Sequence, residues 1–330
     1  MNQKPLVSIC CITFNHENFI KDAIEGFLLQ KTTFPIEIII HDDASTDKTK
    51  EFIEIYRNKH PDLIIPIYQT VNQYSQGIKP LPNYVFPRAR GKYIALCEGD
   101  DYWTDPYKLQ KQVDFLENNE DYILCFTNTK IINSAGQTIK EKFVDIYKKS
   151  SFDHYDMPIF APSLTRVFRN RHLEGLPLTT VPGGDTYLLV WQSKFGKIKF
   201  IDEVTSIYRR HSQGIYSSLN NFQRLVHQYE TRYGCLNIVQ KDLLPKFYKE
   251  LLGLLLKMTE IGIAGYSKYL KMIFYSLKSD WKYLSIRNNL IIVFVLLLLM
   301  LFNLKYKTHY IRYLTKNTLN KIIVCDSKLI

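Results

Sequence analysis

Lys92-Tyr93-Ile94-Ala95-Leu96-Cys97-Glu98-Gly99-Asp100-Asp101-Tyr102-Trp103 is the stretch that decides the fold, because a buried strand runs there straight into a cluster of acids. Residues 92–97 are β-prone and have no polar face, which predicts a strand in the middle of a parallel sheet. Glu98, Asp100 and Asp101 follow at once, and Gly99 permits a sharp turn between them. Ligands of open α/β sheets bind beyond the carboxyl ends of the strands, so this turn is a candidate binding site.

Two interpretations of the acidic turn remain open on local grounds. A divalent cation, Mg²⁺ or Mn²⁺, would relieve the repulsion between the carboxylates, because it binds one or two of them and takes its other ligands from substrate oxygens. The alternative is an acidic loop before a helix, for which Asp105 and Pro106 are suited as N-cap and first helical residue. Tyr102 and Trp103 are equally suited to packing on a sugar and to the core.

The first part of the chain alternates strand-like and helix-like segments. Strands are expected at 7–14, 36–40, 63–68, 92–97 and 122–127, and helices at about 17–30, around 52–56 and at 106–118. Asn15 is expected to cap the first of these helices. Such alternation is typical of an open, mainly parallel sheet that is wrapped by helices.

The alternation fades after residue 128. Residues 130–182 appear as loop-rich sequence, a helix is expected at 186–195, and a strand at 198–208 ends in Arg209-Arg210-His211. From about residue 220 the pattern is helical. We therefore expect an α/β domain over residues 1–215 and a helical C-terminal region over residues 216–330.

The distribution of charge distinguishes the first 240 residues from the C-terminal 90. The chain carries a net charge of +11, and residues 241–330 hold 15 Lys and Arg against 5 Asp and Glu, which leaves 28 against 27 in residues 1–240. The run 290–302 is thirteen apolar residues long, shorter than the roughly 20 that a membrane-spanning helix needs. This predicts an amphipathic region at an anionic membrane surface. A true membrane span and a buried core helix are the alternatives.

The cysteines and the N-terminus indicate the compartment. The six cysteines form no CxxC pair, and four of them lie in apolar, strand-like runs, which predicts reduced core thiols. The first apolar run, 6–14, is short and contains Ser8 and Thr13, unlike a secretory signal. We expect a cytoplasmic protein that is peripheral at the cytoplasmic face of the membrane.

Three further residues are candidates for chemistry. Asp43 ends a strand and can accept a hydrogen bond from a uracil or thymine imide, because Ser45 to Asp47 suit the capping of the next helix and leave Asp43 free. Asp185 follows two glycines at a helix start, as either an N-cap or a general base. His211 is either a structural residue or a metal ligand beside arginines that suit phosphate.

Together these segments resemble the family 2 glycosyltransferases, inverting nucleotide-sugar enzymes of the GT-A fold. The resemblance covers about residues 5–215 and rests on four motifs in order, Val7-Ser8-Ile9 with Thr13-Phe14-Asn15, Asp42-Asp43-Ala44-Ser45-Thr46-Asp47, Glu98-Gly99-Asp100-Asp101-Tyr102-Trp103 and Gly183-Gly184-Asp185. Two departures are visible: Ala44 replaces the usual glycine, and the QxxRW signature of processive synthases is missing. The second departure implies that one sugar is added per encounter.

The resemblance implies specific roles. Asp185 matches the catalytic base, and Asp101 and His211 are the expected ligands of a divalent metal, Mn²⁺ or Mg²⁺. The nucleotide sugar, expected to be a UDP- or dTDP-sugar, would be bound by Ile12, Thr13, Asn15, Glu17, Asp43, Asp100 and Arg88. The expected acceptor is a hydroxyl of a glycan or of a lipid-linked saccharide, as in bacterial surface-polysaccharide synthesis.

Two other functions are alternatives to a glycosyltransferase. A sugar-phosphate nucleotidyltransferase normally has a glycine-rich phosphate loop after its first strand, where this chain has Asn15-His16-Glu17. A non-catalytic protein that binds through its basic tail is the second alternative, but nucleic acid is not expected as a partner because the basic residues are interleaved with leucines. The chain also lacks the GxxxxGK[ST], GxGxxG, GxSxG and HExxH motifs of other enzyme classes.

Overall fold

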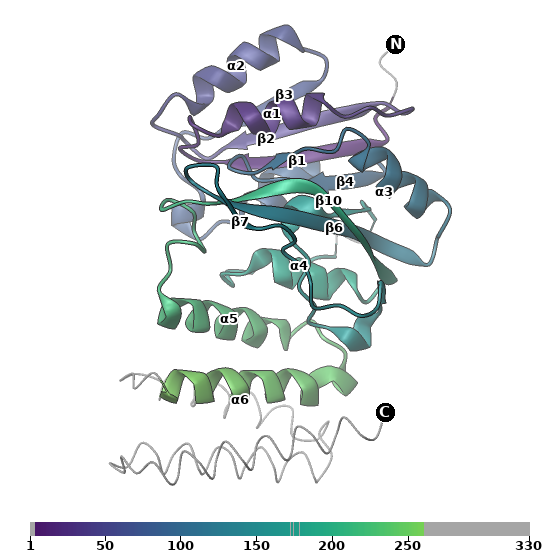
Figure 1. Cartoon of the computed structure of the whole chain (residues 1–330), viewed down its shortest axis with the longest axis vertical. Coiled ribbons are helices and arrows are strands. Elements are labelled where there is room, and N and C mark those ends of the chain that lie inside the picture. Colours follow the sequence, from purple (N-terminus) through teal and green to yellow (C-terminus); the bar gives the residue numbers. More distant parts are fainter. Residues whose placement is uncertain (1–3, 172, 174, 178, 261–330) are drawn as a thin grey trace. The chain divides into compact units, whose positions relative to one another are not determined.

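The computed structural model describes residues 4–171, 173, 175–177 and 179–260, and it shows an α/β fold (Figure 1). By its contacts the chain divides into two compact units, Met1–Leu219 and Asn220–Ile330. The first unit contains the sheet and every candidate site residue, and the described part of the second is helical.

One large sheet organises the first unit. Its strands are β1 (Val7–Thr13), β2 (Ile36–Asp42), β3 (Ile64–Tyr68), β4 (Tyr93–Leu96), β5 (Tyr102–Trp103), β6 (Tyr122–Asn133), β7 (Thr138–Lys140), β8 (Ser151–Phe152), β9 (Val167–Arg169) and β10 (Lys197–Arg210). The order is β3-β2-β1-β4-β9-β6-β10-β5, with β7 on β6 and β8 on β10. The long pairings, among β3, β2, β1 and β4 and between β6 and β10, are parallel. The predicted mainly parallel sheet is therefore confirmed.

Four helices accompany the sheet, α1 (Ile20–Leu28), α2 (Thr49–Lys59), α3 (Lys108–Glu117) and α4 (Gly184–Gln192). Helix α1 buries Ile20, Ile24 and Phe27, which share the face that their spacing predicted. Its Gly26 lies so close to β5 that an added Cβ would stand 2.8 Å from the backbone nitrogen and oxygen of Trp103. The glycine thus allows the segment after the acidic turn to pack directly on α1.

The acidic strand ends meet at the end of β1. The amide of Asp43 donates a hydrogen bond to the carbonyl of Thr13 (3.0 Å), and the amide of Gly99 donates to the carbonyl of Ile12 (2.9 Å). Because β2 and β4 flank β1 in parallel register, their carboxyl ends lie on one edge of the sheet. The prediction that both acidic turns share one edge is confirmed.

Residues 130–182, expected as loops, contain the end of β6 and the short strands β7, β8 and β9. Strand β9 is inserted antiparallel between β4 and β6. Strands of two or three residues are too short to show an alternating pattern, so their pairing partners determine them. The expectation of loops was wrong at these positions.

Asn15 does not cap α1. The helix begins at Ile20 with Phe19 at its N-cap and no side-chain cap, whereas Asn15 has a positive φ of 55°. The Asn15 side chain instead accepts a hydrogen bond from the amide of Thr46 (2.8 Å). The predicted cap was wrong because a contact with a distant loop uses the amide oxygen.

The second unit contains α5 (Asn221–Cys235) and α6 (Leu244–Glu260), which contact each other, as the helical pattern beyond residue 220 predicted. Asn220 and Gln223 form a capping box at the start of α5. Within residues 4–260 no helix combines the length and apolarity that crossing a membrane requires. The apolar run 290–302 lies outside the described residues.

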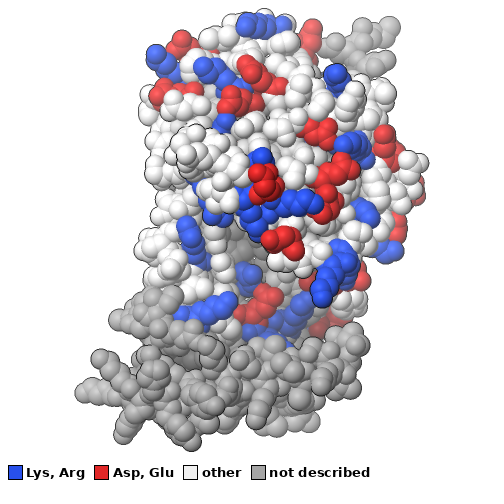
Figure 2. Space-filling view, in the orientation of Figure 1, with Lys and Arg blue, Asp and Glu red and all other residues white. Residues whose placement is uncertain are grey.

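The surface of the described part carries both signs of charge. Figure 2 shows basic and acidic side chains interspersed over the visible face. This agrees with the near balance of charges in residues 1–240. The described cysteines, Cys10, Cys11, Cys97, Cys125 and Cys235, are free and buried, as predicted for core thiols.

Candidate functional site

Asp100 is the centre of the acidic site. Its Oδ2 atom lies 3.0 Å from Nε2 of His211 at the end of β10, and 3.9 Å from Nε2 of His16. Burial would raise the pKa of Asp100, but the His211 hydrogen bond and the two imidazoles together lower it. The fold thus brings a carboxylate and two imidazoles, from three distant segments, to one point.

Asp101 faces a different partner. Its Oδ1 accepts a hydrogen bond from the backbone amide of Arg209 (2.8 Å), and its side chain is buried. Burial, with the charges of Asp100 and Glu98, raises the pKa of Asp101 well above its usual value. His211, the other expected metal ligand, contacts Asp100, and the assignment of Asp101 and His211 to a metal stays a prediction. Asp101 joins the acidic turn to β10.

Several buried polar atoms near Asp100 have no hydrogen-bond partner among the described residues, namely Thr13 Oγ1, His16 Nδ1, Glu98 Oε2 and His211 Nδ1. Burial, followed by the charge of Asp100, raises the pKa of Glu98 to about 7. Buried polar groups are normally paired, so such a gathering indicates a place for a polar ligand.

A divalent cation fits these residues only in part. Within the described residues no group of three or more His, Cys, Asp and Glu side chains is arranged to hold a metal ion. Asp100 and His211 offer one oxygen and one nitrogen ligand in contact with each other. Mg²⁺ and Mn²⁺ accept one or two protein ligands when phosphate and water supply the others. The donor set therefore suits a metal bound together with a diphosphate.

Asp43 is not free, contrary to the prediction. Its Oδ1 accepts a hydrogen bond from the amide of Gln73 (2.8 Å), and its Oδ2 accepts one from the amide of Tyr74 (2.9 Å). The hydroxyl of Tyr84 donates to the side chain of Gln73, and the Tyr84 ring stacks on His41. Asp43 thus fastens the segment 69–91 to the end of β2, a contact between distant residues that no local pattern reveals.

The substitution Asp43→Asn is expected to loosen this segment. An amide in place of the carboxylate sets an NH₂ group against a backbone N–H, which removes one hydrogen bond and leaves a donor unpaired, at a cost of about 1–3 kcal/mol. Limited proteolysis should cut the variant within 69–91 faster than the wild type. Asp62→Asn, at an exposed aspartate, is the matched control. Equal cleavage of Asp43→Asn and the control would contradict the proposed fastening.

The residues after β1 are joined to those after β2. The amide of Asn15 donates to Oγ of Ser45 (2.8 Å), and Glu17 accepts from the amide of Lys48 (3.1 Å). Ile12 and Thr13 lie at the end of β1, and Thr13 is buried. These predicted nucleotide-binding residues are gathered at one sheet edge, with the side chains of Asn15 and Glu17 already engaged.

The side chain of Arg88 has a hydrogen-bond partner close to it in the chain. Its Nη1 donates to the carbonyl of Tyr84 (2.8 Å) within the segment 69–91. The predicted contact of Arg88 with a nucleotide sugar stays a prediction.

Asp185 lies in the first turn of α4, where Gly183 occupies the N-cap without a side-chain cap. Its side chain is 48% exposed, and its Oδ2 lies 3.7 Å from Nη2 of Arg166. Burial lowers the pKa of Lys79, and the charge of Asp185 opposes that shift, so Lys79 also lies nearby. The N-cap interpretation of Asp185 is thus not the one observed: its carboxylate is accessible and flanked by two cations.

Three functional candidates were missed in the sequence, His16, Lys79 and Arg166. His16 directly follows the first strand motif, which was a usable signal. Arg166 is 1% exposed and Lys79 lies in a long irregular segment, so only their spatial neighbours distinguish them.

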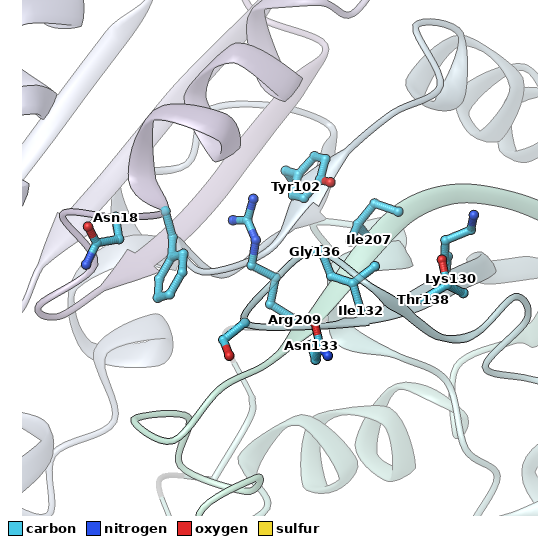
Figure 3. A pocket seen from close by; sticks show the side chains of 11 residues that line it. Asn18, Tyr102, Lys130, Ile132, Asn133, Gly136, Thr138, Ile207 and Arg209 are labelled. Atoms are coloured by element: carbon cyan, nitrogen blue, oxygen red, sulfur yellow. The ribbon is translucent and has the colours of Figure 1, made fainter.

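A hollow of about 420 Å³ is lined by side chains from β5, β6 and β10, among others (Figure 3). It is lined by Asn18, Phe19, Tyr102, Lys130, Ile132, Asn133, Ser134, Gly136, Thr138, Ile207 and Arg209. The Phe19 ring lies 4.7 Å from the His211 ring, and the guanidinium of Arg209 lies 4.4 Å from the Tyr102 ring. Tyr102 therefore faces this hollow, whereas Trp103 is in the core, where its indole donates to the carbonyl of Leu164 (2.8 Å).

Known proteins are similar to this chain in sequence or in fold. An uncharacterized protein of Mycobacterium tuberculosis is 37% identical over 214 residues, which are 64% of this chain and 61% of the relative's own length. A crystal structure of Staphylococcus aureus TarS in complex with UDP-GlcNAc superposes with a TM-score of 0.63 at 16% identity, covering 96% of this chain and 90% of that chain. The mannosyltransferase PcManGT of Pyrobaculum calidifontis, in complex with GDP-Man and Mn²⁺, gives a TM-score of 0.53 at 15% identity, covering 99% and 87%.

These likenesses confirm the predicted GT-A fold. Residues 8–176, more than half of the chain, match the family described as glycosyl transferase family 2. That segment contains the three motifs that end β1, β2 and β4, whose carboxyl ends form the acidic edge. The chain belongs to glycosyl transferase family 2.

Proposed function

We propose that this protein is an inverting glycosyltransferase that moves one sugar from a nucleoside-diphosphate sugar to a hydroxyl of a glycan or lipid-linked acceptor, with Asp185 as general base. The observation that carries the proposal is the position of Asp185. It is accessible, flanked by Arg166 and Lys79, and its charge is among the causes that raise the pKa of the buried Glu98, after burial itself. The proposed base therefore lies within electrostatic range of Glu98 in the acidic turn.

The donor is proposed to bind along the edge formed by the ends of β1, β2 and β4. Its diphosphate would lie at Asp100 and His211, where Thr13 Oγ1 and His211 Nδ1 have no hydrogen-bond partner among the described residues. Support for a nucleotide sugar comes from the related folds, since TarS was crystallised with UDP-GlcNAc and PcManGT with GDP-Man. A UDP- or dTDP-sugar is the proposed donor.

Residues of this chain would do the following in the reaction. Asp185 takes the proton from the acceptor hydroxyl as that oxygen attacks the anomeric carbon, and the bond from this carbon to the diphosphate oxygen breaks on the opposite face. The anomeric configuration is inverted because a single displacement occurs. The hydroxyl becomes acidic as the new bond forms, so an ordinary carboxylate suffices as the base. Asp100 and His211 would hold a divalent cation, which supplies stabilisation of the charge on the departing diphosphate.

The acceptor is proposed to lie at a membrane. Residues 241–330 carry 15 Lys and Arg against 5 Asp and Glu, and the apolar run 290–302 lies among them. Such a region favours an anionic bilayer surface at the cytoplasmic face, where lipid-linked saccharides would be within reach. Flotation of the full chain with vesicles that contain phosphatidylglycerol, reduced by salt, is expected. Failure to float at low salt would contradict this part of the proposal.

Donor binding tests the proposal directly. Titration of a panel of UDP-, dTDP- and GDP-sugars, with and without Mn²⁺, should show one donor whose binding requires the metal. Asp100→Asn should weaken this binding about 10–100-fold, as expected when a ligand of a bound metal is altered. Asp114→Asn, at an exposed aspartate of α3, is the control and should bind like the wild type. If no donor binds in either condition, the proposed function is wrong.

A further inference from the structure

Arg166 is a buried arginine immediately before β9, and its side chain is 1% exposed. An arginine removed from water is costly unless every part of its guanidinium meets a partner. Its burial therefore requires an explanation, and its hydrogen bonds provide one.

The guanidinium joins two segments. Its Nε donates to the carbonyl of Ala161 (3.0 Å), to which Nη2 also donates, and its Nη1 donates to the backbone carbonyl of Asp185 (2.7 Å). Nη2 further lies 3.7 Å from the Asp185 carboxylate. One side chain thus contacts both the backbone and the carboxylate of Asp185.

We propose that Arg166 is a positioning residue for Asp185, which holds the first turn of α4 through the Asp185 carbonyl and keeps the Asp185 carboxylate in place for proton transfer. This inference rests on the proposed function of Asp185 as general base. The planar guanidinium of an arginine has several N–H donors and can make these contacts simultaneously. The ammonium group of a lysine, on a flexible side chain, cannot.

The charges around Arg166 are consistent with this role. Burial lowers the pKa of Arg166, while the charges of Asp185 and then Glu98 raise it. The guanidinium therefore lies near two carboxylates, one at the acidic centre and one at the proposed base. It offsets the repulsion that would otherwise separate them.

Lys79, the other cation near Asp185, has a different position. It belongs to the segment 69–91, and its Nζ lies 4.7 Å from the ring of Tyr74, whose amide is bound by Asp43. Its effect on Asp185 therefore depends on how that segment is placed. Arg166 contacts the backbone of α4 itself, which is what positioning of the base requires.

The test compares Arg166→Gln, Arg166→Lys and Asp185→Asn. The probes are UDP-GlcNAc and GDP-mannose with Mn²⁺, and the measured quantity is the rate of nucleoside diphosphate release at varied donor concentration. Arg166→Gln is expected to lower kcat about 10–100-fold with less than about threefold change in the donor KM.

Arg169→Lys is the matched control. Arg169 is also a buried arginine of the β9 segment, but its guanidinium donates to the carbonyls of Tyr122 and Leu116. Its substitution should lower the melting temperature and leave kcat within about threefold of the wild type. A merely structural role of Arg166 would give the same result for Arg166→Gln, and that result would overturn the inference.

The outcomes separate the two proposals. Full turnover in Asp185→Asn would refute the general base itself. Loss of turnover in Asp185→Asn together with wild-type kcat in Arg166→Gln would refute only the positioning role. If Arg166→Gln does not fold, Arg166→Lys provides the test, since it keeps the positive charge and loses the planar guanidinium. Lowered kcat with retained donor binding in this variant would support the inference. Wild-type kcat would overturn it.

Discussion

Asp185→Asn is expected to lower turnover by about 10²–10⁴-fold, the contribution typical of a general base, while donor binding stays within about threefold of the wild type. Asparagine has nearly the same shape as aspartate but cannot accept the proton of the acceptor hydroxyl. The Asp185 side chain is 48% exposed, so the substitution should not disturb the fold. Initial rates of nucleoside diphosphate release, together with a donor titration, measure both quantities.

The control for this prediction is Asp121→Asn. Asp121 forms an exposed ion pair with Lys197 in the same unit, so its substitution should change neither turnover nor donor binding. Wild-type turnover in Asp185→Asn would show that another group takes the proton. A loss of donor binding in the same variant would instead place Asp185 among the donor contacts.

Lys108→Met is expected to stabilise the protein by about 2 kcal/mol at pH 7. Lys108 lies in α3 and is fully buried, and burial lowers its pKa to about 7. Its Nζ donates to the side chain of Gln112 (2.7 Å) and lies 4.3 Å from the Trp103 ring. Methionine fills the same space without an ammonium group, so the cost of burying the amine disappears. The lost hydrogen bond to Gln112 offsets part of this gain.

The gain should depend on pH with a definite sign. Between pH 7 and pH 10.5 the unfolded chain binds a proton at Lys108 that the folded protein largely lacks, so the free energy of unfolding of the wild type rises with pH over this window. The advantage of Lys108→Met is therefore largest at or below pH 7 and shrinks by up to about 1.4 kcal/mol per pH unit above it. Denaturant unfolding of both proteins at pH 7, 8 and 9 measures the difference.

Lys111→Met provides the comparison on the same helix. Lys111 is exposed and forms surface ion pairs with Asp105 and Glu203, which contribute at most about 1 kcal/mol. Its substitution should not stabilise the protein. The difference in the free energy of unfolding between this variant and the wild type should not shrink with rising pH as predicted for Lys108→Met. Equal behaviour of the two variants would mean that the Lys108 amine is paired more favourably than its burial indicates.

The sequence by itself determined β1 to β4, the start of β6 and α1 to α3, because each of them has a local pattern, whereas the two-residue strand β5 has none. The run 92–97 lacks a polar face, and the helix 20–28 repeats apolar residues at helical spacing, so burial of either can be predicted without knowledge of its neighbours. Acids at strand ends likewise identify an edge of the sheet, because parallel strands end together. The GT-A fold and family 2 membership follow from these features in order.

Only the tertiary structure decided how the acids and cations are paired. Both oxygens of Asp43 accept hydrogen bonds from amides 30 and 31 residues away, His211 contacts Asp100, and the buried Arg166 donates to the backbone carbonyl of Asp185. Such contacts join residues far apart in the chain, and a side chain with several suitable partners is assigned by geometry and burial. The acidic residues at the strand ends were therefore readable from the sequence, whereas Lys79 and Arg166 and the partner of each charged group were set by the packing of the fold.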